Sequence, residues 1–266
     1  MLEPMKMMVR SWLFADLFAV TRTSDAELLD FIGKLRPLDC GIDLIRLGNS
    51  GDGGYLIPDD LQGIEYCFSP GVGPQSDFEN QLASRGIKSF LADYSVESPA
   101  IDNPDFIFDK KFLGASDRGI YFTLSTWKDK YLSQYTGDLF LQMDIEGAEY
   151  EVILNTPSSL LNQFRIAVIE FHSLSRLFDP FTFRLFSACF EKLLEHFYVA
   201  HLHPNNFCGS TKIGEIEIPE IMEFTFLNKR RVSRTAPRPS LPHELDADND
   251  PSTRPLVLSK DWYLSR

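Results

Sequence analysis

The sequence predicts an α/β fold: a doubly wound, mostly parallel sheet with an N-terminal helix and hairpin and a flexible C-terminal tail. From residue 64 onward, short apolar runs that suit strands alternate with amphipathic stretches that suit helices. A glycine-rich turn separates the first of these strands from the next helix, and polar side chains follow several later strands directly. Alternation of this kind is typical of a parallel sheet covered on both faces.

The N-terminal part of the chain is expected to hold one helix and one hairpin. Residues 24–36 read as a helix, with Ser24 as N-cap and four apolar residues on one face, Leu28, Leu29, Ile32 and Leu35. The stretch IRLGNSGDGGYLIPDDL (45–61) has a glycine-rich centre, which predicts a turn between two short strands. We expect residues 1–62 to form an extension ahead of the main domain.

The main domain is expected to span residues 63–228. Its strands are predicted at 64–69, 88–95, within 106–114, and at 138–145, 165–173, 197–204 and 218–227. Its helices are predicted at 76–86, 125–135, 149–156 and 180–197. Ser76 followed by Glu79 indicates a capping box for the first of these helices, and Pro157 stops the third.

The C-terminal residues 229–266 are predicted to be a flexible tail or an extended segment that wraps the domain. Residues 229–256 are rich in Pro, Arg, Ser and Asp and have almost no apolar pattern. The last residues are more apolar, and their candidates for docking back onto the domain are Leu256, Val257, Leu258 and Trp262.

Composition and charge narrow the class of protein. The formal net charge of −12 argues against a nucleic-acid partner, because such proteins carry basic surfaces that neutralise phosphates. No apolar run reaches the ~20 residues of a membrane helix, and no clear cleavage site follows the mildly amphipathic first 20 residues. The four cysteines form no CxxC pair and read as buried free thiols (Cys40, Cys67, Cys189 and Cys208). We therefore expect a cytoplasmic protein with neither nucleic-acid nor membrane partner.

A nucleotide site is predicted after the first core strand. Gly71 and Gly73 in SPGVGPQS (69–76) let the backbone turn tightly and approach a ligand at a helix start. Asp93 ends the next strand 20 residues after Gly73 (93 − 73), where a carboxylate can bind ribose hydroxyls or simply cap a turn. Asp117, after the third strand, could hold an adenine edge or belong to a plain surface turn.

The same glycine loop is a poor match to a nicotinamide site. A third glycine would be expected where Ser76 stands, and the bulky Pro74 leaves little room for a pyrophosphate. These two residues favour a nucleoside that carries no pyrophosphate.

Polar residues at three further strand ends predict the chemical end of the site. Asp144, Glu170, His172 and His203 converge on one mouth if their strands are parallel neighbours. A histidine is a natural base near neutral pH, and Asp144 with Glu170 could instead hold a divalent cation. The alternative is that the carboxylates pair with the histidines and serve structure alone.

In order, the segments DGGY, SPGVG, MDIEGAEYEV, VIEFH and HLHPNN resemble those of the FkbM-type methyltransferase family, over roughly residues 45–227. MDIEGAEYEVI (143–153) is the most specific of these segments. The resemblance implies a class I methyltransferase fold, which is Rossmann-like, with seven strands of which the last is antiparallel.

The resemblance also implies a cofactor and a reaction. It implies S-adenosylmethionine bound at Gly71 and Gly73, with Asp93 on the ribose, Asp117 near the adenine and Asp144 near the methionine end. Many members of the family methylate hydroxyls of sugars or other small molecules, and some relatives use Mg²⁺ at positions matching Asp144 and Glu170. His172 stands where a further acid is expected, and Pro70 replaces a commoner acidic residue.

We therefore expect an O-methyltransferase that acts on a small-molecule or sugar hydroxyl. The site residues would be His172, His203 and Asp144 in catalysis, and Gly71, Gly73, Asp93, Asp117 and Asp144 at the cofactor. Two alternatives remain open on the sequence: another nucleotide-dependent enzyme, and a binding domain that kept the fold without turnover.

Overall fold

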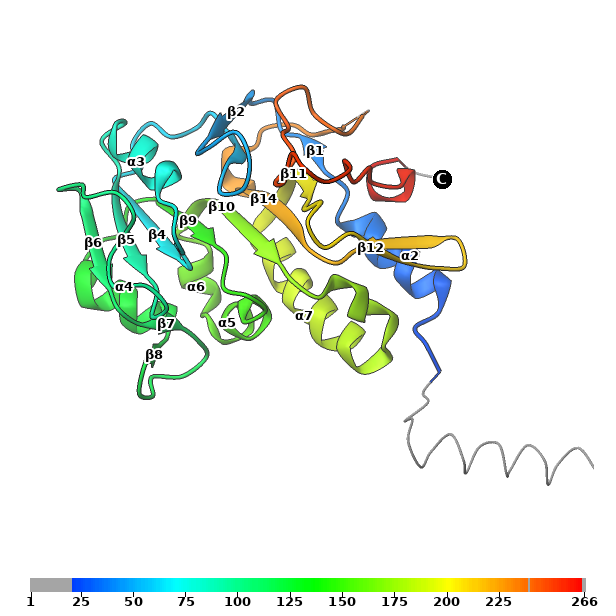
Figure 1. The fold of residues 1–266 in the computed structure, drawn as a ribbon, viewed down its shortest axis with the longest axis horizontal. Helices are drawn as coiled ribbons and strands as arrows, with labels where there is room; N and C mark the ends of the chain where they lie inside the picture. The colour runs from blue at the N-terminus through cyan, green and yellow to red at the C-terminus, as the bar shows by residue number, and fades with distance from the viewer. Residues whose placement is uncertain (1–20, 239, 265–266) are drawn as a thin grey trace, which may run out of the picture.

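A seven-stranded sheet forms the centre of the computed structural model, which describes residues 21–238 and 240–264 (Figure 1). Its strands lie in the order β11-β14-β10-β9-β4-β5-β6. Their bounds are β4 Tyr66–Pro70, β5 Lys88–Ala92, β6 Phe106–Asp109, β9 Leu139–Met143, β10 Phe164–Phe171, β11 Phe197–Pro204 and β14 Met222–Asn228. All seven correspond to strands expected from the sequence.

The pairing within this sheet is parallel except at one strand. β10, β9, β4, β5 and β6 pair in parallel, whereas β14 is antiparallel to both β10 and β11. Every residue of β9 and β10 is buried, as expected for central strands covered on both faces. The doubly wound fold with an antiparallel last strand is thereby confirmed.

Two different layers cover the sheet (Figure 1). One core cluster joins the sheet to helices α2 (Asp25–Lys34), α4 (Leu124–Leu132), α5 (Glu149–Asn155) and α7 (Pro180–His196). The other joins it to α3 (Asp77–Ala83) and to the hairpin of β2 (Leu44–Leu47) and β3 (Tyr55–Pro58). The expected glycine-rich hairpin therefore covers part of the second face together with α3. It lies beside the carboxyl end of the sheet.

Side chains cap the starts of α2 and α7 as the local sequence favours, whereas the start of α3 has no such cap. Ser24 forms a complete capping box with Glu27, and Asp179 caps α7 through the Thr182 amide. At α3, Ser76 occupies the N-cap position, but its hydroxyl accepts from the Ile101 amide and makes no cap hydrogen bond. The predicted capping box at Ser76 and Glu79 is wrong, because the Glu79 side chain points inward to Ser69.

Several short elements had no clear signal in the sequence. They are α6 (Ser158–Leu161), the antiparallel hairpin of β12 (Ser210–Ile213) and β13 (Ile216–Pro219), and the parallel pair β7 (Phe112–Leu113) and β8 (Tyr121–Phe122). Two-residue strands β1 (Leu38–Asp39) and β15 (Ala236–Pro237) also pair, antiparallel. The 3₁₀ turns are η1 (Leu174–Phe178), η2 (Lys229–Arg231) and η3 (Lys260–Trp262).

The described C-terminal residues lie against the domain. Trp262 is fully buried and its indole N–H donates to the Glu217 carbonyl at 3.1 Å. Leu258 is also buried, whereas Val257 is 67 % exposed. The division into an extension, a main domain and a tail at residues 62 and 228 stays a prediction.

The expectations about the cysteines, about membrane helices and about the first 20 residues have different outcomes. Cys40, Cys67 and Cys189 are buried free thiols as expected, but Cys208 is exposed. Within residues 21–238 and 240–264, no helix has the length and apolar character needed to cross a membrane. The interpretation of the first 20 residues as lacking a signal peptide falls outside the described residues.

Candidate functional site

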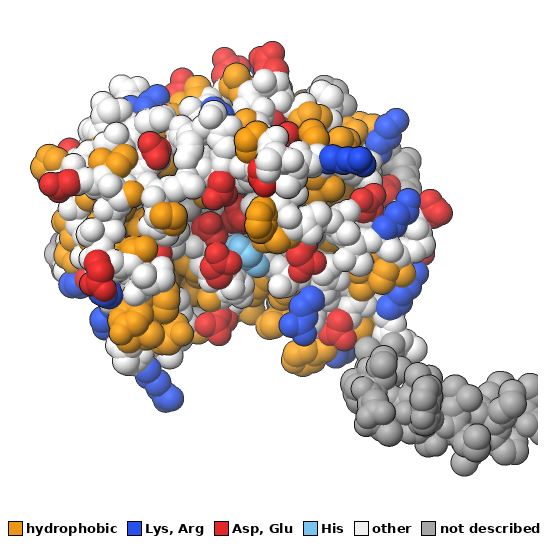
Figure 2. Space-filling view, viewed as in Figure 1, with side chains coloured by type: hydrophobic (Ala, Val, Ile, Leu, Met, Phe, Trp, Pro, Cys, Tyr) orange, Lys and Arg blue, Asp and Glu red, His pale blue; other side chains and the backbone are white. Residues whose placement is uncertain are grey.

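A cavity of about 710 Å³ opens at the carboxyl ends of β4, β5 and β9. This is the edge at which doubly wound folds bind ligands. Four of the predicted site residues line it: Gly71, Gly73, Asp93 and Asp144. Tyr55 from the hairpin lines it too. Figure 2 shows acidic side chains gathered around a hollow in the middle of this face, with a histidine among them.

Gly71 is required by a close approach of two strand ends. Its φ is +82°, and a β-carbon there would overlap the carbonyl oxygen of Asp144. The crossing is fixed by backbone hydrogen bonds, from Gly71 N–H to Ala92 O at 2.9 Å and from Asp144 N–H to Pro70 O at 3.2 Å. The glycine thus lets β4, β5 and β9 converge at the floor of the cavity.

Asp93 ties the glycine loop to the end of β5. Its Oδ2 accepts from the Gly73 amide at 2.9 Å, and its Oδ1 accepts from the amide and hydroxyl of Ser95, both at 2.7 Å. The side chain is 5 % exposed yet lines the cavity. Each carboxylate oxygen can accept two hydrogen bonds, so Oδ2 keeps capacity for a ligand hydroxyl.

Asp117 lies elsewhere. Its carboxylate accepts from the Thr123 amide at 2.8 Å and from the Thr126 hydroxyl at 2.9 Å, and it is not among the residues that line the cavity. These bonds hold the pKa of Asp117 below its ordinary value and stabilise the start of α4. Of the two roles considered for Asp117, an adenine contact and a plain surface turn, its position in the structure fits the turn.

Two aromatic rings near the same loop were missed by the sequence reasoning. Phe112 and Tyr121, from β7 and β8, line the cavity, and their ring centroids are 5.8 Å apart. The two strands are two residues long each, so no periodic pattern in the sequence marked them. Flat apolar surface of this kind suits a planar base.

A buried chain of polar groups lies under the cavity. Ser69 Oγ is within hydrogen-bonding distance of Glu79 Oε1 and 2.6 Å from Gln142 Oε1, and Gln142 Nε2 donates to the Tyr55 hydroxyl at 3.2 Å. Burial raises the pKa of Glu79, although the Ser69 contact opposes it. A protonated Glu79 can donate to Ser69, which leaves the single Ser69 hydrogen for Gln142.

His172 is surrounded by carboxylates and does not itself line the cavity, although Asp144 and Glu146 beside it do. Its Nδ1 lies 3.2 Å from Glu149 Oε1, and its Nε2 lies 3.5 Å from Glu146 and 3.7 Å from Asp144. Glu149 Oε1 also accepts from the Ile145 and Gly147 amides, which fixes its position. Because Glu149 can only accept as a carboxylate, it favours the tautomer with hydrogen on Nδ1 and leaves the Nε2 lone pair free.

The charges around His172 shift its pKa and that of Asp144. Burial by itself lowers the pKa of His172, but the Glu149 hydrogen bond and the neighbouring carboxylates outweigh it and raise the pKa. Burial raises the pKa of Asp144 to about 7, partly offset by His172. A carboxyl and an imidazole whose pKa values are both raised, and which lie 3.7 Å apart, form a group able to exchange a proton.

Residues 129–198 match the family model of the methyltransferase FkbM domain. The segment runs from α4 to the start of β11 and includes Asp144, Glu149 and His172. The resemblance inferred from the sequence is confirmed over this segment, which is less than half of the chain. Over these residues the chain is similar to the methyltransferase FkbM domain.

Comparison with solved structures gives a likeness of fold. The fibrillarin/Nop5p complex is 12 % identical, over 63 % of this chain and 74 % of that chain, with a TM-score of 0.38. An E. coli prophage protein assigned as a DNA modification methyltransferase is 10 % identical, over 62 % of this chain and 47 % of that chain, with a TM-score of 0.39. A structure described under the conversion of a disulfide bond into a thioacetal group during echinomycin biosynthesis is 14 % identical, over 74 % of this chain and 87 % of that chain, with a TM-score of 0.32. No curated protein matches the sequence.

Glu170 lies within the matched segment beside His172 and, like His172, does not line the cavity. Its Oε1 is 3.8 Å from His172 Nε2 and accepts from Asn205 at 3.1 Å, and its Oε2 has no hydrogen-bond partner among the described residues. Burial, then repulsion from Asp144 and Glu223, raises its pKa well above the ordinary value. Glu170 and Asp144 each have an oxygen without a hydrogen-bond partner among the described residues, but the side chains whose ligand atoms lie within 4.8 Å of one another here are those of Asp144, Glu149 and His172. The cation on Asp144 and Glu170 therefore stays a prediction.

His203 belongs to a different group of side chains. It lies on β11, separated from β10 by β14, and its register partner on β14 is Glu223, which in turn faces Glu170. Its Nδ1 is 3.5 Å from Asp246 of the C-terminal segment. The structure therefore brings Asp144, Glu170 and His172 together and places His203 apart from them.

Proposed function

We propose that this chain is an S-adenosylmethionine-dependent O-methyltransferase acting on a hydroxyl of a sugar or other small molecule. One observation carries the choice of cofactor. Six acidic residues line the cavity, and no Lys or Arg is among its described lining residues (the acids are Asp52, Asp77, Glu79, Asp93, Asp144 and Glu146). Even with Glu79 protonated, the other acids give a negative lining that attracts a cationic ligand and repels phosphates. S-adenosylmethionine carries a sulfonium and an ammonium, whereas a nicotinamide dinucleotide carries a pyrophosphate.

The cofactor would extend from the glycine loop to Asp144. Asp93 Oδ2 keeps a free acceptor position for a ribose hydroxyl, and Phe112 and Tyr121 offer apolar surface for the adenine. Asp144, which lines the cavity beside Gly71, would bind the ammonium of the methionine moiety. The cavity volume of about 710 Å³ leaves room for a small acceptor beside the cofactor.

His172 would serve as the general base. S-adenosylmethionine supplies an electrophilic methyl group, so the protein has to orient the acceptor hydroxyl and remove its proton. The Nε2 atom of His172 lies 3.5 Å from Glu146 and 3.7 Å from Asp144, which both line the cavity, and Glu149 contacts Nδ1 on the other side of the ring. Glu149 is thus a positioning residue, and the cluster of carboxylates stabilises the imidazolium that forms.

A cation on Asp144 and Glu170 and the absence of nucleic-acid partners both stay predictions. A cation there would supply Lewis-acid activation of the hydroxyl as an alternative to His172. The net charge of −12 supports a small-molecule acceptor over a nucleic acid.

Calorimetric titration with S-adenosylhomocysteine tests the cofactor assignment. We expect micromolar binding that is lost in Asp93→Ala, and no comparable binding of NAD⁺. Repeating the titration with Mg²⁺ and with a chelator tests the cation, because a metal-dependent affinity would support Asp144 and Glu170 as ligands. Absence of S-adenosylhomocysteine binding in all conditions would overturn the proposal in favour of a binding domain for another ligand.

The reaction is tested by following S-adenosylhomocysteine formation with a panel of hydroxylated sugars and small phenols. With an acceptor found, His172→Asn should lower kcat about 10²- to 10⁴-fold, the usual contribution of a general base, and leave S-adenosylhomocysteine affinity unchanged. His196→Asn, on α7 away from the cavity, is the matched control. Unchanged turnover in His172→Asn at neutral pH would exclude His172 as the base.

A further inference from the structure

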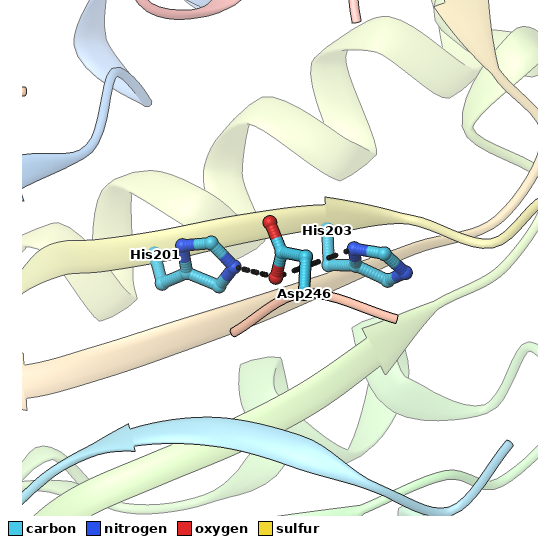
Figure 3. Close-up of side chains that lie close together, drawn as sticks. All are labelled: His201, His203 and Asp246. Atoms are coloured by element: carbon cyan, nitrogen blue, oxygen red, sulfur yellow. Dashed lines mark hydrogen bonds and ion pairs between the residues drawn. The ribbon is translucent and has the colours of Figure 1, made fainter. Parts of the chain in front are cut away.

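A second cluster of side chains lies outside the methyltransferase cavity, between β11 and the C-terminal segment. His201 and His203 are two residues apart on β11, so both project from the same face of the strand. Asp246 comes from the segment that follows β15. Figure 3 shows its carboxylate between the two imidazole rings. All three side chains are buried, with 2 %, 9 % and 6 % of their surfaces exposed, respectively.

The distances in this cluster match those between ligands of one metal ion. His201 Nε2 lies 2.8 Å and His203 Nδ1 lies 3.5 Å from Asp246 Oδ1, and one ligand atom from each residue lies within 4.8 Å of the others. Two ligands of a tetrahedral zinc ion, with bonds of about 2.0–2.1 Å, are about 3.3 Å apart. The two measured separations bracket that value.

The protein's own groups leave this cluster incompletely paired. Two imidazoles share a single carboxylate oxygen, and His203 Nδ1 makes no hydrogen bond among the described residues although it points at that oxygen. A buried polar nitrogen without a partner is costly, about 1–3 kcal/mol. An ion between the three side chains would give this nitrogen a partner.

Supporting contacts and an entry path are also present. The other Asp246 oxygen, Oδ2, accepts from the His243 backbone amide at 2.7 Å, and ligating carboxylates are typically held by such outer contacts. A cavity of about 240 Å³ is lined by His203, His243 and Asp246. It gives solvent access to the cluster and room for a water as fourth ligand.

We propose that His201, His203 and Asp246 form a binding site for a divalent transition-metal ion of the zinc type. Two imidazoles and one carboxylate select such an ion over Mg²⁺ or Ca²⁺, which prefer oxygen donors. Its ligands come from the sheet and from the C-terminal segment, so the bound ion joins the two. The site is independent of the methyl-transfer assignment.

The test is calorimetric titration of the chelator-treated full-length chain with Zn²⁺, with Mg²⁺ as a second titrant. We expect one equivalent of Zn²⁺ to bind with micromolar or tighter affinity, and Mg²⁺ not to bind at this site. His203→Asn and Asp246→Asn should each weaken Zn²⁺ binding at least about 100-fold. His172→Asn should leave it unchanged, which separates this cluster from the one formed by Asp144, Glu149 and His172.

A second measurement distinguishes loss of metal binding from loss of folding in the variants. Co²⁺ bound to the wild-type chain should give the visible absorption of a four-coordinate site, and His203→Asn should abolish it while the circular dichroism spectrum stays native. Zn²⁺ should also raise the melting temperature of the wild type but not of His203→Asn. Failure of the wild type to bind Zn²⁺, or binding that depends on His172 and not on His203, would overturn the proposal.

Discussion

Asp93 Oδ2 accepts a hydrogen bond of 2.9 Å from the Gly73 amide, which joins the end of β5 to the glycine loop after β4. The carboxylate therefore has a structural partner in the absence of any ligand. A ribose-binding role and a loop-holding role are both open to this residue, and the two make different predictions.

The substitution Asp93→Asn separates these roles. The asparagine carbonyl can still accept from Gly73, but its NH2 group cannot accept from the Ser95 amide, so we expect the melting temperature to fall modestly while the chain stays folded. Loss of the charge should weaken S-adenosylhomocysteine binding about 10- to 100-fold, since hydrogen bonds to a charged group contribute about 1.5–3 kcal/mol. Calorimetry measures the affinity, and the exposed Asp102→Asn is the control. Unchanged affinity would assign Asp93 to the loop alone.

The two glycines of the loop should respond differently to alanine. Both have positive φ, +82° at Gly71 and +50° at Gly73. A β-carbon at Gly71 overlaps the Asp144 carbonyl, whereas one at Gly73 has nothing within 4 Å. We expect Gly71→Ala to lower the free energy of unfolding by about 3 kcal/mol or more, and Gly73→Ala by about 1 kcal/mol.

Urea unfolding of the two glycine variants measures this difference. Gly73→Ala should remain folded well enough for titration and should bind S-adenosylhomocysteine less tightly, because the added methyl group occupies open space beside the cavity. Equal losses of stability in the two variants would contradict the close crossing of β4 and β9 at Gly71.

The sheet could be predicted from the sequence because its signals are local. Strands β9 and β10 are mostly apolar and fully buried, and polar residues stand at several of the expected strand ends. The rule that parallel strands present their carboxyl ends at one edge then placed Gly71, Asp93 and Asp144 together. The same rule brought His172 next to Asp144, at 3.7 Å.

The expectations that differed from the structure depended on distant partners. Glu79 has the spacing of a capping residue, but its side chain is buried against Ser69 and is governed by packing under the cavity. His203 ends a strand at the expected edge, but Asp246 reaches it from a segment without apolar pattern. Contacts between residues so far apart leave no periodic signal in a single sequence.

Glu79 should make stability depend on pH. Its pKa in the folded chain is raised above the ordinary value of 4.5, so the folded state prefers the protonated carboxyl. The contribution of this group to stability is full below pH 4.5 and is lost as the pH rises toward the folded pKa. Glu79→Gln keeps an uncharged side chain of the same shape and should lack this loss.

We expect the free energy of unfolding of Glu79→Gln, relative to wild type, to increase from pH 4.5 to pH 7.5. Urea unfolding at several pH values measures it, and comparison with the wild type cancels the contributions of other buried acids. Glu97→Gln is the control, because the Glu97 side chain is 87 % exposed. A difference that stays constant with pH would show that Glu79 is ionised in the folded chain.

Trp262 tests whether the C-terminal segment is part of the folded unit. The side chain is fully buried, and its indole N–H donates to the Glu217 carbonyl on β13 at 3.1 Å. Trp262→Ala removes that hydrogen bond and leaves a large cavity, so we expect the free energy of unfolding to fall by about 3–5 kcal/mol. Val257→Ala, at a residue 67 % exposed in the same segment, should change it by less than about 0.5 kcal/mol. If both variants unfold with the stability of the wild type, residues 229–266 behave as the flexible tail that their composition predicts, and the contact between Asp246 and β11 is not maintained in solution.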